Sequence, residues 1–85
     1  MGEIADHAPN GPELTDYDRE HMITYLRLLD AEASGARWEE AARLLLRVDP
    51  QRARDTARLR YESHARRARW MATEGYLELL RAARG

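Results

Sequence analysis

Cysteine is absent from this 85-residue sequence, which excludes disulfide frameworks, thiol chemistry and cysteine-bound zinc or iron–sulfur sites. Long apolar runs are absent too. The longest one, Leu44 to Leu46, falls far short of the about 20 residues that cross a membrane. No positively charged start followed by an apolar core opens the chain, so we expect no signal peptide. Together these absences favour a cytoplasmic protein without a membrane segment.

The chain also lacks the features of a catalytic domain. A domain of this size buries about 60–65% of its unfolded surface, which leaves little room for a deep pocket. The histidines, His7, His21 and His64, have no metal-ligand spacing, and no glycine-rich phosphate loop is present. Ser63 and His64 are adjacent, so on a helix their side chains should point about 100° apart. We therefore expect a non-enzymatic binding module with no cofactor and no metal.

Strand-forming residues are scarce, with no phenylalanine and a single valine. Alanine, arginine and leucine, all strong helix formers, contribute 14, 14 and 11 residues. All basic residues are arginine and none is lysine, a bias that a GC-rich bacterial genome would explain. The composition predicts an all-α fold.

Two prolines and an Asn-Gly pair near the N-terminus indicate a flexible, mildly acidic tail at residues 1–14, followed by a helical domain at residues 15–85. Hydrophobic periodicity within the domain predicts four helices joined by short links. They are expected at residues 16–33, 37–47, 50–73 and 76–83. The second and third helices, joined by a short turn, resemble a helix-turn-helix unit, although many small bundles share that arrangement.

Capping residues mark the ends of these helices. Thr15, with Asp18 three residues later, has the pattern of a capping box. Gly35 is suited to end the first helix, and Asp49 before Pro50 is suited to start the third.

The spacing of apolar residues predicts which helix faces are buried. The expected core residues of the first and last helices are Met22, Tyr25, Leu26, Leu29 and Ala33, and Tyr76, Leu77 and Leu80.

Charge is distributed unevenly along the chain. Residues 1–36 carry eight acidic residues and two arginines, whereas residues 37–85 carry twelve arginines and seven acidic residues. This asymmetry has two interpretations, an interaction surface or an acidic first helix packed near a basic third one. Both remain open from the sequence.

The third predicted helix is rich in arginine, with seven arginines and two acidic residues between residues 51 and 70. They are Arg52, Arg54, Arg58, Arg60, Arg66, Arg67 and Arg69. All except Arg60 are candidates for contacts to nucleic acid. However, at 100° per residue they scatter around most of the helix, and acidic residues at helical spacing suggest a solvated face. We therefore expect little DNA binding by this chain alone.

Further large side chains lie outside the predicted core faces and are candidates for partner binding. Leu59 and Trp70 lie roughly opposite the core, near Arg66, and Trp and Arg are favoured hot-spot residues. Tyr17 and Leu28 form a similar extra stripe on the first helix. The alternative for Trp70 is that it packs beneath the last helix or against the first.

An ordered set of short segments, taken together, resembles one protein family. The segments are YLRLLDA at residues 25–31, WEEAA at 38–42, DP at 49–50, RARWM at 67–71 and GY at 75–76. The set is similar to a proteobacterial DNA-binding domain of transcription regulators, found in regulators of conjugative-element transfer and of type VI secretion. The resemblance covers most of the chain and implies a variant helix-turn-helix.

The resemblance to family members that consist of this domain alone implies a role other than promoter binding. They act as antiactivators, which bind transcriptional activators such as a LuxR-type quorum-sensing activator and an excision activator, and so repress transfer of an integrative and conjugative element. The sequence consists of this domain with little else and interrupts the basic helix at Tyr61–His64. We therefore favour an antiactivator that is a monomer when free and has transcriptional activators as partners. The alternatives are a DNA-binding transcriptional regulator and an antitoxin-like or scaffold bundle.

Overall fold

The computed structural model describes residues 3–84, which form helices and connecting segments without a strand. The helices are α1 (Asp16–Glu20), α2 (Met22–Ala33), α3 (Trp38–Leu45), α4 (Arg54–Trp70), the π-helical turn η1 (Met71–Gly75) and α5 (Tyr76–Arg84). The all-α prediction is confirmed, and all four expected ranges contain helix. The first range is divided at His21 into α1 and α2.

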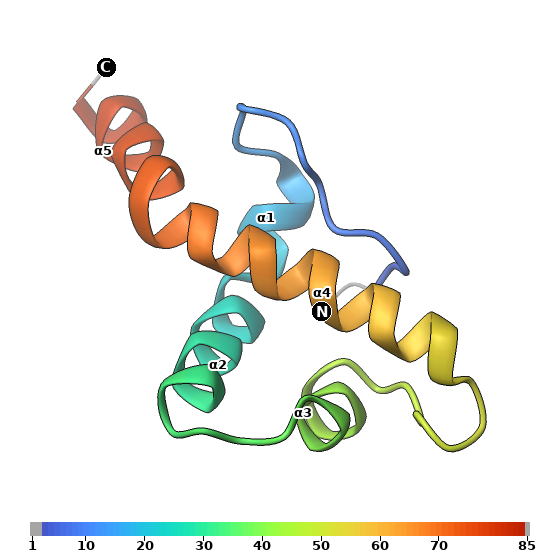
Figure 1. The fold of residues 1–85 in the computed structure, drawn as a ribbon. Helices are drawn as coiled ribbons and strands as arrows, with labels where there is room; N and C mark the ends of the chain where they lie inside the picture. Colours follow the sequence, from blue (N-terminus) through green and yellow to red (C-terminus); the bar gives the residue numbers. More distant parts are fainter. Residues whose placement is uncertain (1–2, 85) are drawn as a thin grey trace.

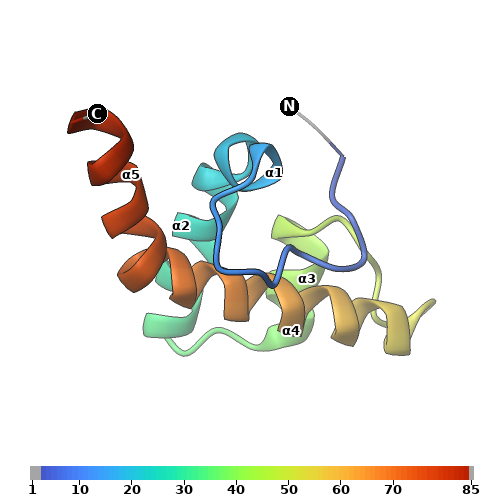
Figure 2. The same ribbon diagram turned by 90° about the horizontal axis from the view of Figure 1, so that it is seen from above.

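Helices α4, η1 and α5 follow one another as a long, bent rod (Figure 1). Helices α2 and α3 both pack against α4. Helix α5 extends away from the other helices (Figure 2), and the molecule is elongated, with extents of 46 × 24 × 21 Å. None of the helices within residues 3–84 is long and apolar enough to span a membrane.

The expected caps of the first helical range are present. Thr15 and Asp18 form the predicted capping box at the start of α1. Gly35 has a φ of 77° after α2. The N–H groups of Gly35 and Ala36 donate to the carbonyls of Glu32 and Ala31, at 3.2 and 3.0 Å. Glycine suits this left-handed position because it has no Cβ.

The link between α3 and α4 is longer than the sequence suggested, and the predicted helix start at Pro50 is wrong. The Asp49 carboxylate accepts a hydrogen bond from the N–H of Gln51 at 2.9 Å. Its carbonyl accepts from the N–H groups of Arg52 and Ala53. These bonds close a local turn, so α4 begins only at Arg54. The two helices of the predicted helix-turn-helix are therefore joined by residues 46–53.

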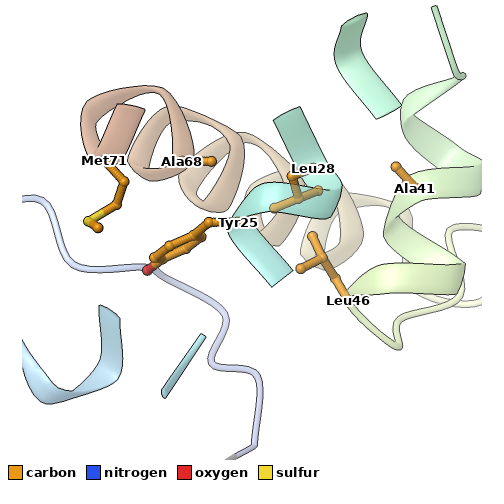
Figure 3. Close-up of a cluster of buried hydrophobic side chains, with 6 residues drawn as sticks. All are labelled: Tyr25, Leu28, Ala41, Leu46, Ala68 and Met71. Carbon is orange, nitrogen blue, oxygen red and sulfur yellow. The ribbon is translucent and has the colours of Figure 1, made fainter. Parts of the chain in front are cut away.

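The buried core lies where α2 and α3 meet α4 (Figure 3). It is formed by Tyr25, Leu28, Ala41, Leu46, Ala68 and Met71. On α2 the expected core face is partly wrong, because Leu26 and Ala33 are exposed whereas Leu28 is 3% exposed. The buried face also includes His21, a polar residue that hydrophobic periodicity does not assign to a core.

The predicted packing of the last helix is also wrong. Tyr76, Leu77 and Leu80 are exposed on α5, which buries none of its residues. The preceding π-helical turn adds residues beyond an α-helical repeat and so changes which face of the helix meets α2. Glycine is required at position 75 because a Cβ there would lie only 2.8 Å from the Trp70 ring, which is too close.

Residues 3–14 form an irregular segment that lies along α4 (Figure 2). Ala8 is buried, and its N–H donates to Ser63 Oγ at 3.1 Å. Asp6 pairs with Arg60 at 2.7 Å. The flexibility expected for residues 1–14 stays a prediction, and residues 1–2 and 85 lie outside the described part of the chain.

Candidate functional site

The arginines expected on the third helix divide into two groups. Arg60 and Arg67 point toward the N-terminal segment, and their side chains are 17% and 2% exposed. The other five are exposed, namely Arg52, just before the helix, and Arg54, Arg58, Arg66 and Arg69 on α4. At 100° per residue, the four on α4 project within an arc of about 120°. The seven arginines together still scatter around most of the helix, but burial of Arg60 and Arg67 leaves the exposed arginines of α4 on one side.

Carboxylates share this surface, which we call the exposed α4 face. Asp55 and Glu62 project within the same arc and are exposed. Three exposed ion pairs involve its arginines. They join Arg54 to Glu39, Arg58 to Glu62 and Arg69 to Glu32. Within residues 3–84, only Arg52 and Arg66 of this face make no ion pair. The face is therefore a mixed-charge surface.

Trp38 of α3 anchors the start of the exposed α4 face. The guanidinium carbons of Arg54 and Arg58 lie 5.1 and 4.8 Å from the centroid of its ring, within the range of cation–π attraction. The ring also lies 6.1 Å from that of Tyr61, in a tilted arrangement. These contacts hold two of the arginines against α3 and limit how freely they can reach outward.

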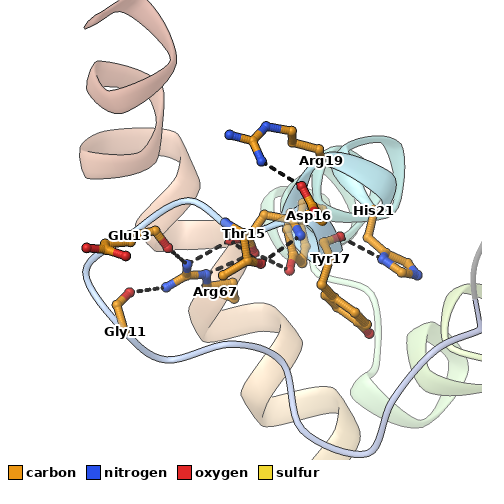
Figure 4. Close-up of polar contacts among 10 residues, drawn as sticks. Gly11, Glu13, Thr15, Asp16, Tyr17, Arg19, His21 and Arg67 are labelled. Carbon is orange, nitrogen blue, oxygen red and sulfur yellow. Dashed lines mark hydrogen bonds and ion pairs between the residues drawn. The ribbon is translucent and has the colours of Figure 1, made fainter. Parts of the chain in front are cut away.

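Arg67 is a structural residue that joins α4 to α1 and to the N-terminal segment (Figure 4). Its Nε donates to Asp18 Oδ1 at 3.0 Å and its Nη2 to Oδ2 at 2.7 Å. It also donates to the carbonyls of Gly11, at 2.6 Å, and Glu13, at 2.8 Å. The guanidinium carbon lies 3.8 Å from the centroid of the Trp70 ring. Arg67 is therefore not available to nucleic acid, contrary to its place among the candidate contacts.

Asp18 is the buried partner of Arg67, with a side chain that is 0% exposed. Tyr25 Oη donates to its Oδ1 at 2.8 Å, and Thr15 donates through both N–H and hydroxyl to Oδ2. Burial by itself would raise the pKa of Asp18, but the hydrogen bonds from Arg67, Thr15 and Tyr25 hold it below its usual value. The carboxylate is therefore charged and fully satisfied at neutral pH.

Three ion pairs connect the acidic first half of the chain to the basic second half. They join Asp6 to Arg60, Asp18 to Arg67 and Glu32 to Arg69. At these pairs the uneven charge distribution corresponds to internal complementarity, one of the two interpretations left open by the sequence.

Tyr17 and His64 form a second polar link between α1 and α4. His64 Nδ1 lies 2.7 Å from the Arg60 carbonyl oxygen, so this nitrogen carries the proton and Nε2 accepts a hydrogen bond from Tyr17 Oη. The N–H of Ala5 donates to the same hydroxyl at 3.1 Å. The Tyr17 ring stacks on that of His21, with centroids 4.0 Å apart. Tyr17 is thus engaged within the chain.

Ser63 and His64 approach more closely than helical geometry suggested, with Oγ 3.3 Å from Nδ1. This contact is not a serine–histidine pair of the catalytic kind, because Nδ1 already donates its proton to a backbone carbonyl and cannot accept the serine proton. Ser63 instead binds the N-terminal segment through Ala8 and Asp6. Among residues 3–84 no group of three His, Asp or Glu side chains could hold a metal ion.

Comparison with protein families gives a match that spans nearly the whole chain. Residues 1–81 match the model of the RovC DNA-binding domain, described as a T6SS transcription factor DNA-binding domain. The chain belongs to this family. The match includes residues 1–14, which the sequence set apart as a tail, and the family is a DNA-binding domain of a class that is not typically enzymatic. A comparison with curated proteins finds no match.

Within this family fold, the five residues expected to bind a partner do not form one surface. Leu59 is 42% exposed and Arg66 is exposed, both on α4. Trp70 is half-buried, packed against the core and under Arg67. Tyr17 is half-buried, and the surface position expected for Leu28 is wrong because α2 turns this residue into the core. Leu59 and Arg66 are thus the two most accessible members of the set.

The roles of Arg60 and Arg67 were missed by sequence reasoning. Their partners on α1 and in the N-terminal segment lie 49 to 56 residues away. Helical spacing carries no signal for such contacts, because it relates only residues three or four positions apart.

We expect acid to destabilise the protein through His64. Burial lowers the pKa of His64, with further lowering by the charges of His21, Arg60 and His7, although the hydrogen bond to the Arg60 carbonyl opposes it. The unfolded chain, with a histidine pKa of about 6.5, therefore takes up a proton before the folded one does. Stability should be fully present above about pH 6.5 and should fall by about 1 kcal/mol between pH 7 and pH 5.5, as measured by urea unfolding.

The control for this effect is His64→Gln, which cannot titrate. Its stability, although lower at neutral pH, should change little over the same interval, because Asp18 titrates below its usual acidic value. An equal loss in both proteins would assign the acid sensitivity to another group.

Proposed function

We propose that this member of the transcription factor family is an antiactivator, which acts in the cytoplasm by binding transcriptional activators. The chain resembles the antiactivator QseM, and the expected partners are a LuxR-type quorum-sensing activator and an excision activator. Binding would cover an activator's DNA-binding or dimerising surface and so repress transfer of an integrative and conjugative element. The chain would be a monomer when free.

The observation that carries this proposal is the mixed charge of the exposed α4 face. Asp55 and Glu62 lie among its arginines, and would face phosphates if α4 entered a DNA groove. Three of the arginines already have carboxylate partners. Because DNA affinity comes largely from neutralised phosphates, a face that carries its own anions, on a chain of net charge −1, is poorly suited to DNA.

The same face suits contact with a protein. Leu59 is 42% exposed and projects about 20° beyond the edge of the arginine arc, and Arg66 lies two turns further along α4 without an ion pair in the described part of the chain. An exposed apolar side chain and an unpaired guanidinium on the same helix are typical of protein interfaces, in which arginine is enriched.

A DNA-binding transcriptional regulator is the second candidate function. It is favoured by the family description and by the arc of about 120° that contains the exposed α4 arginines. In this case the contacts would come from Arg52, Arg54, Arg58, Arg66 and Arg69. Arg67 would be left out because it is buried with Asp18.

The two candidates differ in salt dependence, which fluorescence anisotropy of a labelled DNA duplex measures. The antiactivator proposal predicts weak binding without sequence preference. A regulator that neutralises several phosphates would show a log Kd that rises with log salt with a slope of several units.

A matched variant makes this test sharper. Asp55→Asn with Glu62→Gln removes the anions from the exposed α4 face and should strengthen binding to the duplex. Tight, sequence-dependent binding by the unmodified protein would contradict the antiactivator proposal.

A further inference from the structure

A second exposed surface lies on α2 and α3, on the side away from α4. Ile23 of α2 is 62% exposed and Leu44 of α3 is 65% exposed, whereas Tyr25 and Ala42 on the opposite sides of these helices are buried. Ile23 and Leu44 line one groove, with a volume of about 190 Å³, to which no residue of α4 contributes. We call it the α2–α3 groove. The large aliphatic side chains of Ile23 and Leu44 are exposed to water in this groove, where a partner could cover them.

The α2–α3 groove also contains cations that lack a partner within the described residues. Arg27 and Arg47 both line it, both are exposed, and neither makes an ion pair in residues 3–84. A single carboxylate, that of Glu20, lies with them, so the groove has a net positive charge. Arg47 has a φ of 56°, a left-handed conformation that costs a residue other than glycine about 1 kcal/mol or more. The backbone thus holds Arg47 at the groove in an unfavourable conformation.

One end of the groove is already in contact with an acidic and apolar segment of the chain itself. Ile4 lines the groove and is half-buried against the core. Two residues later, Asp6 pairs with Arg60 at 2.7 Å, and Arg60 also donates to the Leu46 carbonyl at 2.9 Å. This contact shows the chemistry that this side of the molecule accepts, an aliphatic side chain followed by a carboxylate bound to arginine.

We propose that the α2–α3 groove binds an acidic, amphipathic segment of a protein partner, with aliphatic side chains on Ile23 and Leu44 and carboxylates on Arg27 and Arg47. The inference rests on the proposed function in that the partner is a transcriptional activator. It adds a surface separate from the exposed α4 face. Charge complementarity with Arg27 and Arg47 calls for an anionic partner, and the exposed side chains of Ile23 and Leu44 favour an amphipathic peptide over nucleic acid, whose phosphates would leave them uncovered.

The test uses a synthetic peptide of 16 residues that carries leucines at positions i, i+3, i+4 and i+7 and glutamates elsewhere, added to the ¹⁵N-labelled full chain. We expect amide shifts around Ile23, Arg27, Leu44 and Arg47. Ile23→Asp and Arg27→Glu should each raise the Kd about tenfold or more, because each removes a central contact and adds a repulsive charge. The matched control is Leu77→Asp, which adds the same charge at an exposed leucine of α5 outside the groove and should leave the Kd unchanged.

A second peptide, with lysine in place of each glutamate, and a DNA duplex complete the test. Equal binding of the lysine peptide, binding of the duplex to the same amides, or peptide shifts confined to α4 or α5 would overturn the proposal. The same variants separate it from the proposed function. If Ile23→Asp still binds the activator, the groove proposal fails and the antiactivator proposal stands. If the chain binds the acidic peptide but no activator, the reverse holds.

Discussion

Replacing Arg67 with alanine should destabilise the protein by about 3–5 kcal/mol, because it leaves the Asp18 carboxylate buried without its cation. The substitution also removes the donors that bind the Gly11 and Glu13 carbonyls to α4. A domain of this size has a total stability of about 5–15 kcal/mol, so the variant should be partly unfolded at moderate temperature. Thermal and urea unfolding followed by circular dichroism measure the effect.

Arg66→Ala is the matched control, since Arg66 is the exposed neighbour of Arg67 in the sequence. It should change stability by no more than about 0.5 kcal/mol. The double variant Asp18→Ala with Arg67→Ala should lose less than the sum of the single losses, because no uncompensated charge remains. If Arg67→Ala were as stable as Arg66→Ala, the buried ion pair would not hold α1 to α4.

The second large effect is expected at Leu28, which the sequence predicts in a partner-binding stripe and which the structure places in the core. Leu28→Ala should cost about 2–5 kcal/mol, because the side chain is 3% exposed and packs in the central cluster. Leu59→Ala, at a position that is 42% exposed, should cost less than about 1 kcal/mol.

Binding of an activator should be affected in the opposite order, more by Leu59→Ala than by Leu28→Ala. In the folded fraction, Leu28→Ala should bind an activator normally, whereas Leu59→Ala should bind it more weakly with little loss of stability. If Leu28→Ala left the free energy of unfolding unchanged and weakened binding, Leu28 would be a surface residue that contacts the partner, and its place in the core would be contradicted.

Local signals account for the parts of the fold that could be predicted from the sequence. Thr15 with Asp18 and the glycine at position 35 act within a few residues of themselves, so their caps were predictable. Asp49 shows the limit of such signals. An aspartate before proline can begin a helix or close a turn, and here its carboxylate bonds to Gln51 and delays α4 by four residues.

Long-range polar contacts account for most of what the sequence did not reveal. Periodicity places the core by apolar side chains alone, yet Asp18, His21, His64 and Arg67 are buried because they satisfy one another or the backbone. The buried face of α2 includes Leu28 beside these polar residues. The polar contacts also remove Arg60 and Arg67 from the exposed arginine set, so the DNA-binding alternative could not be weighed correctly before the fold was known.

The α5 helix illustrates a different limit. Its leucines have the spacing of a core helix, but the helix follows a π-helical turn and buries none of its residues. A single-turn π-helix has no sequence pattern that distinguishes it from an α-helix, and glycine at position 75 is the only local indication.

The measurement that tests the antiactivator proposal most directly is a mobility-shift assay of a LuxR-type activator from the same bacterium on its own promoter DNA, with this protein added in increasing amounts. We predict that the activator–DNA complex disappears when the amount of this protein equals that of the activator, and that no complex between this protein and DNA replaces it. An unchanged activator–DNA complex, or a new salt-sensitive complex of the protein with the promoter, would contradict the proposal and favour a DNA-binding regulator.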